Sequence, residues 1–135
     1  VTARTIIIAP PPAVGGHVTH HASGAAGLYG LETHAVPYDP TQMTIDIDAL
    51  RREAKRLRPK LITVAGSLCL YPYPVREVRA IADEIGAYVL YDAAHMAGMI
   101  AGKRFQRPLA EGAHLPECGR QRSVGLGDNS IPAAA

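Results

Sequence analysis

Short apolar runs alternate with longer amphipathic stretches along this chain. Residues 5–9, 61–65 and 87–91 are rich in Ile, Val, Leu and Ala, and each has a proline or glycine directly beside it. Runs of this length and composition predict β-strands. Because the runs are apolar at consecutive positions and do not alternate, we expect the strands to be covered on both faces. Residues 32–38, followed closely by Pro40, form a fourth candidate strand.

Two stretches show the apolar periodicity of a helix. In residues 46–58 apolar side chains recur on one face, Asp46 is suited to cap the N-terminus, and Pro59 would end the helix. Residues 74–85 carry a second apolar stripe, and Gly86 is suited to the position after its C-terminus. The two stretches predict amphipathic helices that pack against the strands.

The order strand, helix, strand, helix, strand is typical of a parallel sheet with right-handed crossovers. We therefore predict the α/β class, with a mostly parallel sheet and flanking helices. Residues 13–30, rich in glycine and histidine, are expected to form a loop with about one helical turn. After Leu115 no usable period is found. This predicts a domain over residues 1–115 and a disordered tail over residues 116–135.

Composition excludes several classes of protein. Over 135 residues, 47% are hydrophobic and 19% charged, which is typical of a globular domain and not of a disordered chain. The net charge of +2 is small, and the basic residues of the first helix lie among acidic ones, which favours a solvated face over a nucleic-acid surface. No apolar run approaches the ~18 residues that a membrane span needs. With two cysteines and no disulfide framework, we expect a cytoplasmic protein.

A carboxylate and an imidazole follow the third predicted strand. Asp92 stands directly after the run at residues 87–91, and His95 comes three residues later. Ligands of α/β sheets bind outside the carboxyl ends of the strands, so both side chains are candidates for a site. Two alternatives stay open from position alone. Asp92 is also suited to cap a following helix, and His95 to lie within that helix.

Three histidines and a serine are further candidates. His17, His20 and His21 fall at i, i+3 and i+4, a spacing that could serve a metal, but no acidic or cysteine ligand is close in sequence and we expect no metal centre. They could instead lie on the surface, or stack on a ligand beside the flexible backbone of Gly16. Ser67, just beyond the strand at residues 61–65, is either a ligand-binding hydroxyl or an ordinary turn residue.

These residues occur in three motifs, in the order Gly15-Gly16-His17-Val18-Thr19-His20, Val64-Ala65-Gly66-Ser67 and Asp92-Ala93-Ala94-His95. Together they resemble the serine hydroxymethyltransferase family, over roughly residues 8–115. The resemblance implies a central fragment of the large domain of a fold type I pyridoxal-phosphate enzyme. It implies that Asp92 binds the pyridine nitrogen, His95 the phenolic oxygen of the ring, and Ser67 the cofactor. It also implies that His20 stacks on the ring and that Gly16 and Val18 border a tetrahydrofolate site.

The chain departs from the family pattern in two places. Leu68-Cys69-Leu70-Tyr71 replaces the usual Ala-Tyr after the serine, which leaves open a relative that acts on α-methylserine or catalyses a transaldol reaction. No lysine follows Lys103, although the resemblance implies a Schiff-base lysine shortly after residue 115. We therefore assign no certain catalytic residue, and expect a truncated gene or a shifted reading frame.

Three functions remain as hypotheses. The resemblance implies transfer of a one-carbon unit between serine and glycine with tetrahydrofolate, in a homo-oligomer, with the amino acid and folate as partners and neither nucleic acid nor membrane. Because the lysine is missing, the chain alone is expected to be inactive. The alternative is a non-catalytic remnant that binds cofactor or docks with an intact paralogue. The third is a generic α/β binding module whose motif matches are accidental.

Overall fold

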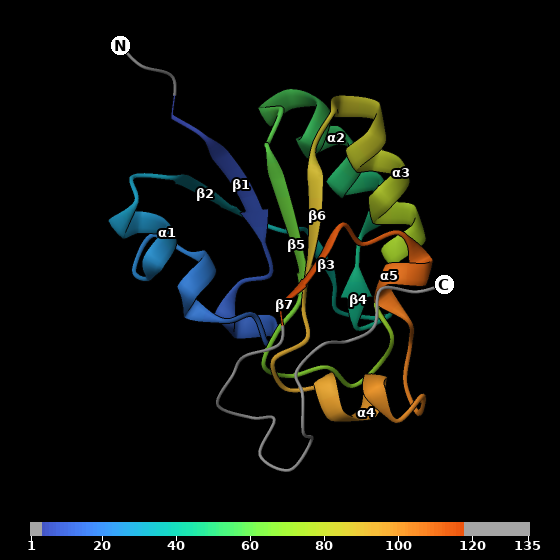
Figure 1. Cartoon of the computed structure of the whole chain (residues 1–135). Helices are drawn as coiled ribbons and strands as arrows, with labels where there is room; N and C mark the ends of the chain where they lie inside the picture. The colour runs from blue at the N-terminus through green and yellow to red at the C-terminus, as the bar shows by residue number, and fades with distance from the viewer. Residues whose placement is uncertain (1–3, 118–135) are drawn as a thin grey trace.

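The computed structural model describes residues 4–117, and its central feature is a parallel five-stranded sheet (Figure 1). The spatial order of the strands is β2 (Glu32–Ala35), β1 (Ile6–Ala9), β5 (Leu61–Ala65), β6 (Tyr88–Asp92) and β7 (Leu115–Glu117). Every neighbouring pair is parallel. A separate antiparallel ribbon joins β3 (Tyr38–Asp39) to β4 (Thr44–Ile45). The predicted α/β class is confirmed.

Helices α2 (Ile47–Leu57) and α3 (Val75–Ile85) pack together beside the sheet and enclose the main core (Figure 1). Both predicted caps are confirmed. Asp46 accepts a hydrogen bond from the Ala49 amide at 2.9 Å, and Gly86 closes α3 with a φ of 70°. Consecutive residues of β1 and β5 are buried, as expected for strands covered on both faces. The core side chains of the strands and helices include Ile8, Leu50, Ile62, Val64, Val78, Ile81, Val89 and Tyr91.

The remaining helices are short and lie near the ends of the strands. They are α1 (Ala25–Leu28), α4 (Ala97–Ala101) and α5 (Pro108–Glu111), with 3-10 turns η1 (Pro12–Val14) and η2 (Val18–His20). The segment 13–30 is therefore more regular than the expected loop. The candidate strand at residues 32–38 is divided into β2 and β3, with Pro37, which has no amide proton for a sheet ladder, between them.

The expected tail begins too early by at least two residues. Pro116 and Glu117 belong to β7, where Tyr91 pairs with Pro116 and Asp92 with Glu117. A proline is tolerated there because β7 stands at the end of the strand order, and an edge strand has amide positions that need no partner. The rest of the predicted tail, residues 118–135, lies outside the described residues.

Two glycine loops meet at the carboxyl ends of β1 and β5. The Gly15 carbonyl accepts hydrogen bonds from the amides of Ser67 at 2.7 Å and Leu68 at 3.2 Å. The two loops are so close that a Cβ added at Gly15 would lie 2.7 Å from the Leu68 carbonyl oxygen, and one at Gly66 would lie 2.7 Å from the Gly15 oxygen. Within the first loop, a Cβ added at Gly16 would lie 1.6 Å from the Pro10 carbonyl oxygen. Gly66 also has a φ of +145°, a conformation that side chains rarely allow. This contact places the segment after Gly16 over the ends of the strands.

We predict that Gly16→Ala lowers the free energy of unfolding by at least about 2 kcal/mol, because the new methyl group has no space without moving backbone. Gly98 in α4 is the matched control: a Cβ there meets nothing within 4 Å. Gly98→Ala should raise the free energy of unfolding by about 0.4–1 kcal/mol through loss of chain entropy in the unfolded state. Urea denaturation measures both changes, and equal effects of the two substitutions would contradict the close packing.

Candidate functional site

Asp92 lies at the carboxyl end of β6, between β5 and β7, and only 3% of its surface is exposed. Its Oδ1 accepts a hydrogen bond from the Ala94 amide at 3.1 Å. The helix that follows begins at Ala97, with Met96 at the capping position, so the interpretation of Asp92 as a helix cap is wrong. The side chain is instead a buried carboxylate at the edge of the sheet where ligands of α/β folds bind.

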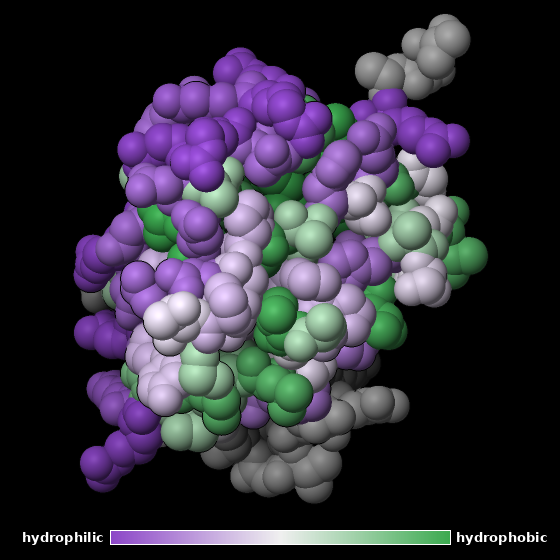
Figure 2. Space-filling view, turned by 180° about the vertical axis from the view of Figure 1, so that it is seen from behind, coloured by the Kyte–Doolittle hydropathy of each residue, from purple (hydrophilic) through white to green (hydrophobic). Residues whose placement is uncertain are grey.

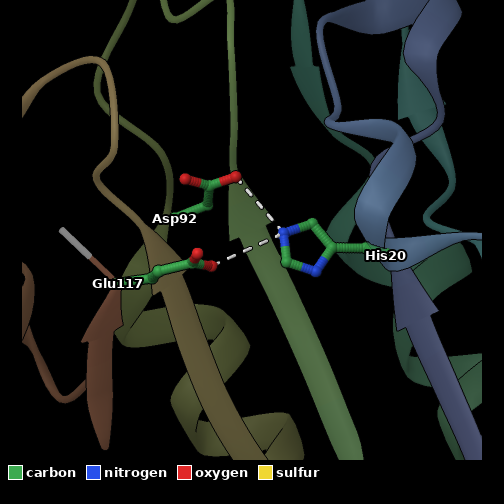
Figure 3. Close-up of side chains that lie close together, drawn as sticks. All are labelled: His20, Asp92 and Glu117. Carbon is green, nitrogen blue, oxygen red and sulfur yellow. Dashed lines mark hydrogen bonds and ion pairs between the residues drawn. The ribbon is translucent and has the colours of Figure 1, made fainter. Parts of the chain in front are cut away.

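His20 reaches this carboxylate from the last residue of η2. Its Nε2 lies 3.2 Å from Asp92 Oδ2, and the side chains are 12% and 5% exposed (Figure 3). Because a carboxylate only accepts, the imidazole donates in this hydrogen bond. The sequence motifs that carry His20 and Asp92 are thus brought together across 72 positions of the chain.

The other two candidate histidines, His17 and His21, do not bind Asp92 with His20. His21 directs its Nε2 to the Pro10 carbonyl oxygen at 2.8 Å. His17 is exposed and accepts a hydrogen bond on Nδ1 from the Thr19 amide at 3.3 Å. The three nitrogens that would form a metal site on one helix face therefore point to separate partners. The rings of His17 and His20 remain near each other, with centroids 6.4 Å apart at 72°.

Glu117 lies beside His20 and Asp92, and these three residues form one cluster. The sequence analysis did not indicate Glu117 as a site residue. Register places it directly opposite Asp92 on the neighbouring strand, and its Oε2 lies 4.0 Å from His20 Nε2 (Figure 3). The backbone is held by a hydrogen bond from the Ala93 amide to the Glu117 carbonyl at 2.8 Å. Two carboxylates thus face one imidazole. Finding this in the sequence requires knowing that residues 115–117 pair with β6, and no periodicity marks so short a strand.

Opposing effects set the pKa of Asp92. Burial raises this pKa. Hydrogen bonds from His20 and the Ala94 amide, together with the charges of His20 and His17, lower it by more than burial raises it, so the pKa lies below the ordinary value of 3.8. Asp92 is therefore ionised at neutral pH although it is buried. An ionised, desolvated carboxylate at a sheet edge can hold a cationic or proton-bearing nitrogen of a ligand.

The remaining predicted site residues differ in their solvent exposure. Ser67 follows β5, is half-buried, and binds Gly15 through its backbone amide. His95 lies in the exposed turn after Asp92, outside the cluster formed by His20, Asp92 and Glu117. Gly16 is buried against the Pro10 backbone, and Val18 is half exposed on η2. Among the predicted cofactor residues, His20 and Asp92 form a direct hydrogen bond with each other.

A cavity of about 310 Å³ opens next to the glycine turn. Gly15, and not Gly16 or Val18, forms part of its wall. Its other lining residues are mostly apolar or aromatic and come from η1, the β3–β4 ribbon and the loop after β5; they include Val14, Tyr38, Met43, Leu68, Leu70, Tyr71 and Tyr73. Seen from behind, hydrophobic residues gather in the lower half of the molecule below a strongly hydrophilic upper part (Figure 2).

The three lysines of the sequence lie on different elements. Lys55, on α2, forms an ion pair with Glu84 at 3.1 Å. Lys60 precedes β5, at the opposite end of the strand from the site, where its amide donates to the Ile6 carbonyl. Lys103 follows α4 in a left-handed conformation with a φ of 56° and is exposed. Within residues 4–117, no helix has the length and apolar character that crossing a membrane requires.

Comparison with known proteins agrees with the motifs. A sequence model of the family described as serine hydroxymethyltransferase matches residues 4–121. An alpha-methylserine aldolase of Variovorax paradoxus is 56% identical over 119 residues, which are 88% of this chain and 27% of that protein. An alpha-methylserine aldolase of a Ralstonia species is 52% identical over 118 residues, 87% of this chain and 27% of the relative.

A serine hydroxymethyltransferase of Archaeoglobus fulgidus is 54% identical over 101 residues, which are 75% of this chain and 23% of that protein. The chain thus spans about a quarter of the length of these relatives. The family match covers most of the chain and includes all three motifs as well as β7. With the parallel sheet and the carboxylate at its edge, these matches show that the chain belongs to the serine hydroxymethyltransferase family.

Proposed function

We propose that this chain forms part of a pyridoxal-phosphate site for chemistry on serine-like amino acids. The observation that carries the proposal is the buried, ionised Asp92 at the carboxyl end of β6, held by His20 and by the Ala94 amide. Such a carboxylate fits a protonated pyridine nitrogen, which is the group that needs a charged acceptor in a desolvated place. When bound, pyridoxal phosphate supplies an electron sink for bonds at the α-carbon of an amino acid.

His20 then has a positioning role as well as the proposed contact with the ring. Its Nε2 proton is directed to Asp92 Oδ2, which fixes the carboxylate and favours its ionised form. If His20 keeps this hydrogen bond to Asp92, a different imidazole would be needed to stack on the face of the cofactor ring. His17 is the alternative stacking residue, because its ring is exposed and lies 6.4 Å from that of His20.

Other contacts in the site stay as proposals. Ser67 and His95 follow the ends of β5 and β6, so both come from the sheet edge where Asp92 lies. Gly16 and Val18 belong to the segment that carries His20, and a tetrahydrofolate co-substrate is proposed beside them. The apolar cavity next to Gly15 is large enough to contribute to such a site. Amino-acid and folate partners, a homo-oligomer and a cytoplasmic location belong to the same proposal.

Two observations support a proposal for the amino-acid substrate. Relatives named alpha-methylserine aldolase and serine hydroxymethyltransferase both exceed 50% identity to this chain. The segment Leu68 to Tyr71 departs from the family pattern, and Leu68, Leu70 and Tyr71 line the cavity. We propose serine or α-methylserine as the amino acid, with the pocket after Ser67 as the part that distinguishes them.

We further propose that the chain alone binds the cofactor without turnover. Of its three lysines, Lys55 is engaged with Glu84 and Lys60 lies at the far end of β5. Lys103 is the lysine that comes nearest in sequence to the Asp92 motif, and it follows α4 on the surface. A protein that binds cofactor or docks with an intact family member is therefore the second candidate function.

Pyridoxal phosphate titrated into the pure chain is expected to bind, with a change in its visible absorption. Asp92→Asn should weaken the affinity at least about tenfold, because a neutral amide loses a charge-assisted hydrogen bond of about 1.5–3 kcal/mol. His34→Ala is the matched control, since His34 is paired with Glu32 away from the site. Absence of binding by the native chain, or equal binding by Asp92→Asn, would contradict the proposed site.

The same titration separates the two histidines. If His17 stacks on the ring, His17→Ala should reduce the affinity and alter the absorption maximum, whereas His20→Ala should act mainly through the ionisation of Asp92 and be strongest at acid pH. Borohydride reduction followed by intact-mass measurement is expected to give no adduct confined to one lysine. An adduct mapped to Lys103, together with turnover of serine, would show that the chain is catalytic by itself.

The lowered pKa of Asp92 predicts a dependence of stability on pH. A carboxyl group whose pKa is lower in the folded state stabilises the fold above the unfolded value, and this contribution is lost as pH falls through the folded value. The free energy of unfolding should therefore decrease as pH falls below 3.8, the ordinary value. Asp92→Asn should give a flatter curve in this range. Urea denaturation from pH 5 to pH 2 measures it, and parallel curves for the two proteins would refute the assignment.

A further inference from the structure

Gln106 is a buried polar residue that the proposed cofactor site does not use. It lies in the loop between α4 and α5, and 9% of its surface is exposed. Its Oε1 accepts hydrogen bonds from the Tyr73 amide at 2.8 Å and the Tyr91 hydroxyl at 3.0 Å. Its Nε2 donates to the Tyr73 carbonyl at 3.0 Å and to Glu111 Oε2 at 2.8 Å. A primary amide has two donor hydrogens and two acceptor lone pairs, so Gln106 uses all of its hydrogen-bonding capacity.

The partners of Gln106 determine which way its amide faces. In the reverse orientation, Nε2 would meet the N–H of Tyr73, and Oε1 would meet the Tyr73 carbonyl and the Glu111 carboxylate, which only accept. Burial raises the pKa of the Tyr91 hydroxyl, so this group keeps its proton and donates to Oε1 at neutral pH. Gln106 is therefore held in one orientation, and loss of its amide would leave buried groups on three other residues without these partners.

The segment that carries Gln106 is attached to the helices of the core. Glu111, on α5, accepts from Gln106 through Oε2 and from the Arg107 amide through Oε1 at 2.9 Å. The next residue, Gly112, accepts a hydrogen bond on its carbonyl from Arg79 of α3 at 2.8 Å. Since α3 is part of the main core, Gln106 connects the backbone at Tyr73 to a firmly packed element.

Tyr73 is one of two anchor points of the loop at residues 66–74, which contains neither helix nor strand. At the start of the loop, the amides of Ser67 and Leu68 donate to the Gly15 carbonyl. At the other end, Gln106 binds both the N–H and the carbonyl of Tyr73, much as a neighbouring strand would. The loop is thus held to the glycine turn at one end and to Gln106 at the other.

The residues between the anchors form one wall of the cavity next to the glycine turn. Leu70 and Tyr71 are 74% and 57% exposed, so their own packing against the rest of the chain does not fix the loop. Together with Leu68 and Tyr73, they line the cavity of about 310 Å³. The position of this wall therefore depends on the two anchors, and Gln106 is the anchor that lies outside the three sequence motifs.

We propose that Gln106 is a positioning residue for amino-acid selectivity, because it holds Tyr73 and thereby fixes the wall of the cavity. This role rests on the proposed function, in which the pocket after Ser67 distinguishes serine from α-methylserine. The two amino acids differ by one methyl group. An apolar wall distinguishes a methyl group from a hydrogen only while it keeps its place, since a wall that moves adapts to both. A wall fixed in advance also loses less conformational freedom when a ligand binds.

Amide hydrogen exchange measured by NMR on the full chain tests the anchor directly. In the native chain, the Tyr73 amide is expected to exchange more slowly than the amides of Leu70 and Tyr71. Gln106→Met removes the hydrogen bonds at a similar side-chain length and should raise the Tyr73 exchange rate at least about tenfold. Gln42→Met is the matched control, because Gln42 is exposed between β3 and β4, and it should leave this rate unchanged.

Tyr91→Phe separates positioning from overall stability. It removes a different hydrogen bond of the same amide and should lower the free energy of unfolding. The exchange rate of Tyr73, relative to the slowest core amides, should nevertheless stay native. If Gln106→Met and Tyr91→Phe changed this relative rate equally, the positioning role would be overturned. If Gln106→Met fails to fold by circular dichroism, the native chain decides, because a Tyr73 amide that exchanges as fast as that of Tyr71 would overturn the anchor.

Two stable compounds test the selectivity, namely the reduced adducts of pyridoxal phosphate with serine and with α-methylserine. The native chain is expected to bind them with different affinities in calorimetry, and Gln106→Met should bring the ratio of affinities at least about threefold closer to one. Gln42→Met should keep the native ratio. Faster Tyr73 exchange with an unchanged ratio would overturn the role in selectivity. Binding of neither compound by the native chain would refute the cofactor proposal and with it this role, while the exchange of Tyr73 would still decide whether Gln106 anchors the loop.

Discussion

The hydrogen bonds from Ser67 and Leu68 to the Gly15 carbonyl determine where the candidate site forms. They join the loop after β5 to the turn after β1, and glycine at positions 15 and 66 is what allows the two backbones to come so close. η2 starts two residues beyond this turn, and from there His20 reaches Asp92. The hydrogen bonds from His20 to Asp92 and from His21 to the Pro10 carbonyl then hold η2 over the ends of the central strands.

The parallel sheet then collects residues that are far apart in the chain. Register places Ala65, Asp92 and Glu117 side by side at the carboxyl edge, so three separate strand ends contribute to one small region. Such a region is costly for Asp92, because burial opposes its charge. The imidazole of His20 and the Ala94 amide offset this cost, and the pKa is lowered in spite of the burial. The hydrogen bond from His20 thus both stabilises the buried charge of Asp92 and joins η2 to β6.

The sequence predicts the parts of the fold that depend on local physical chemistry. The three central strands follow from uninterrupted apolar runs, and the caps of α2 and α3 follow from Asp46 and Gly86 acting on their own turns. The family motifs also indicated both Asp92 and His20, although their mutual contact depends on the glycine loops. Local chemistry is sufficient here because each of these elements is specified by neighbours in the chain.

The sequence does not indicate residues whose position depends on contacts with segments far away in the chain. Glu117 gains its place only from β7, a strand of three residues that contains a proline and has no apolar period. Gln106 shows the same limit. It is buried, and it accepts hydrogen bonds from the Tyr73 amide at 2.8 Å and the Tyr91 hydroxyl at 3.0 Å. A polar residue in a loop gives no sequence sign that it will satisfy buried groups on two other segments.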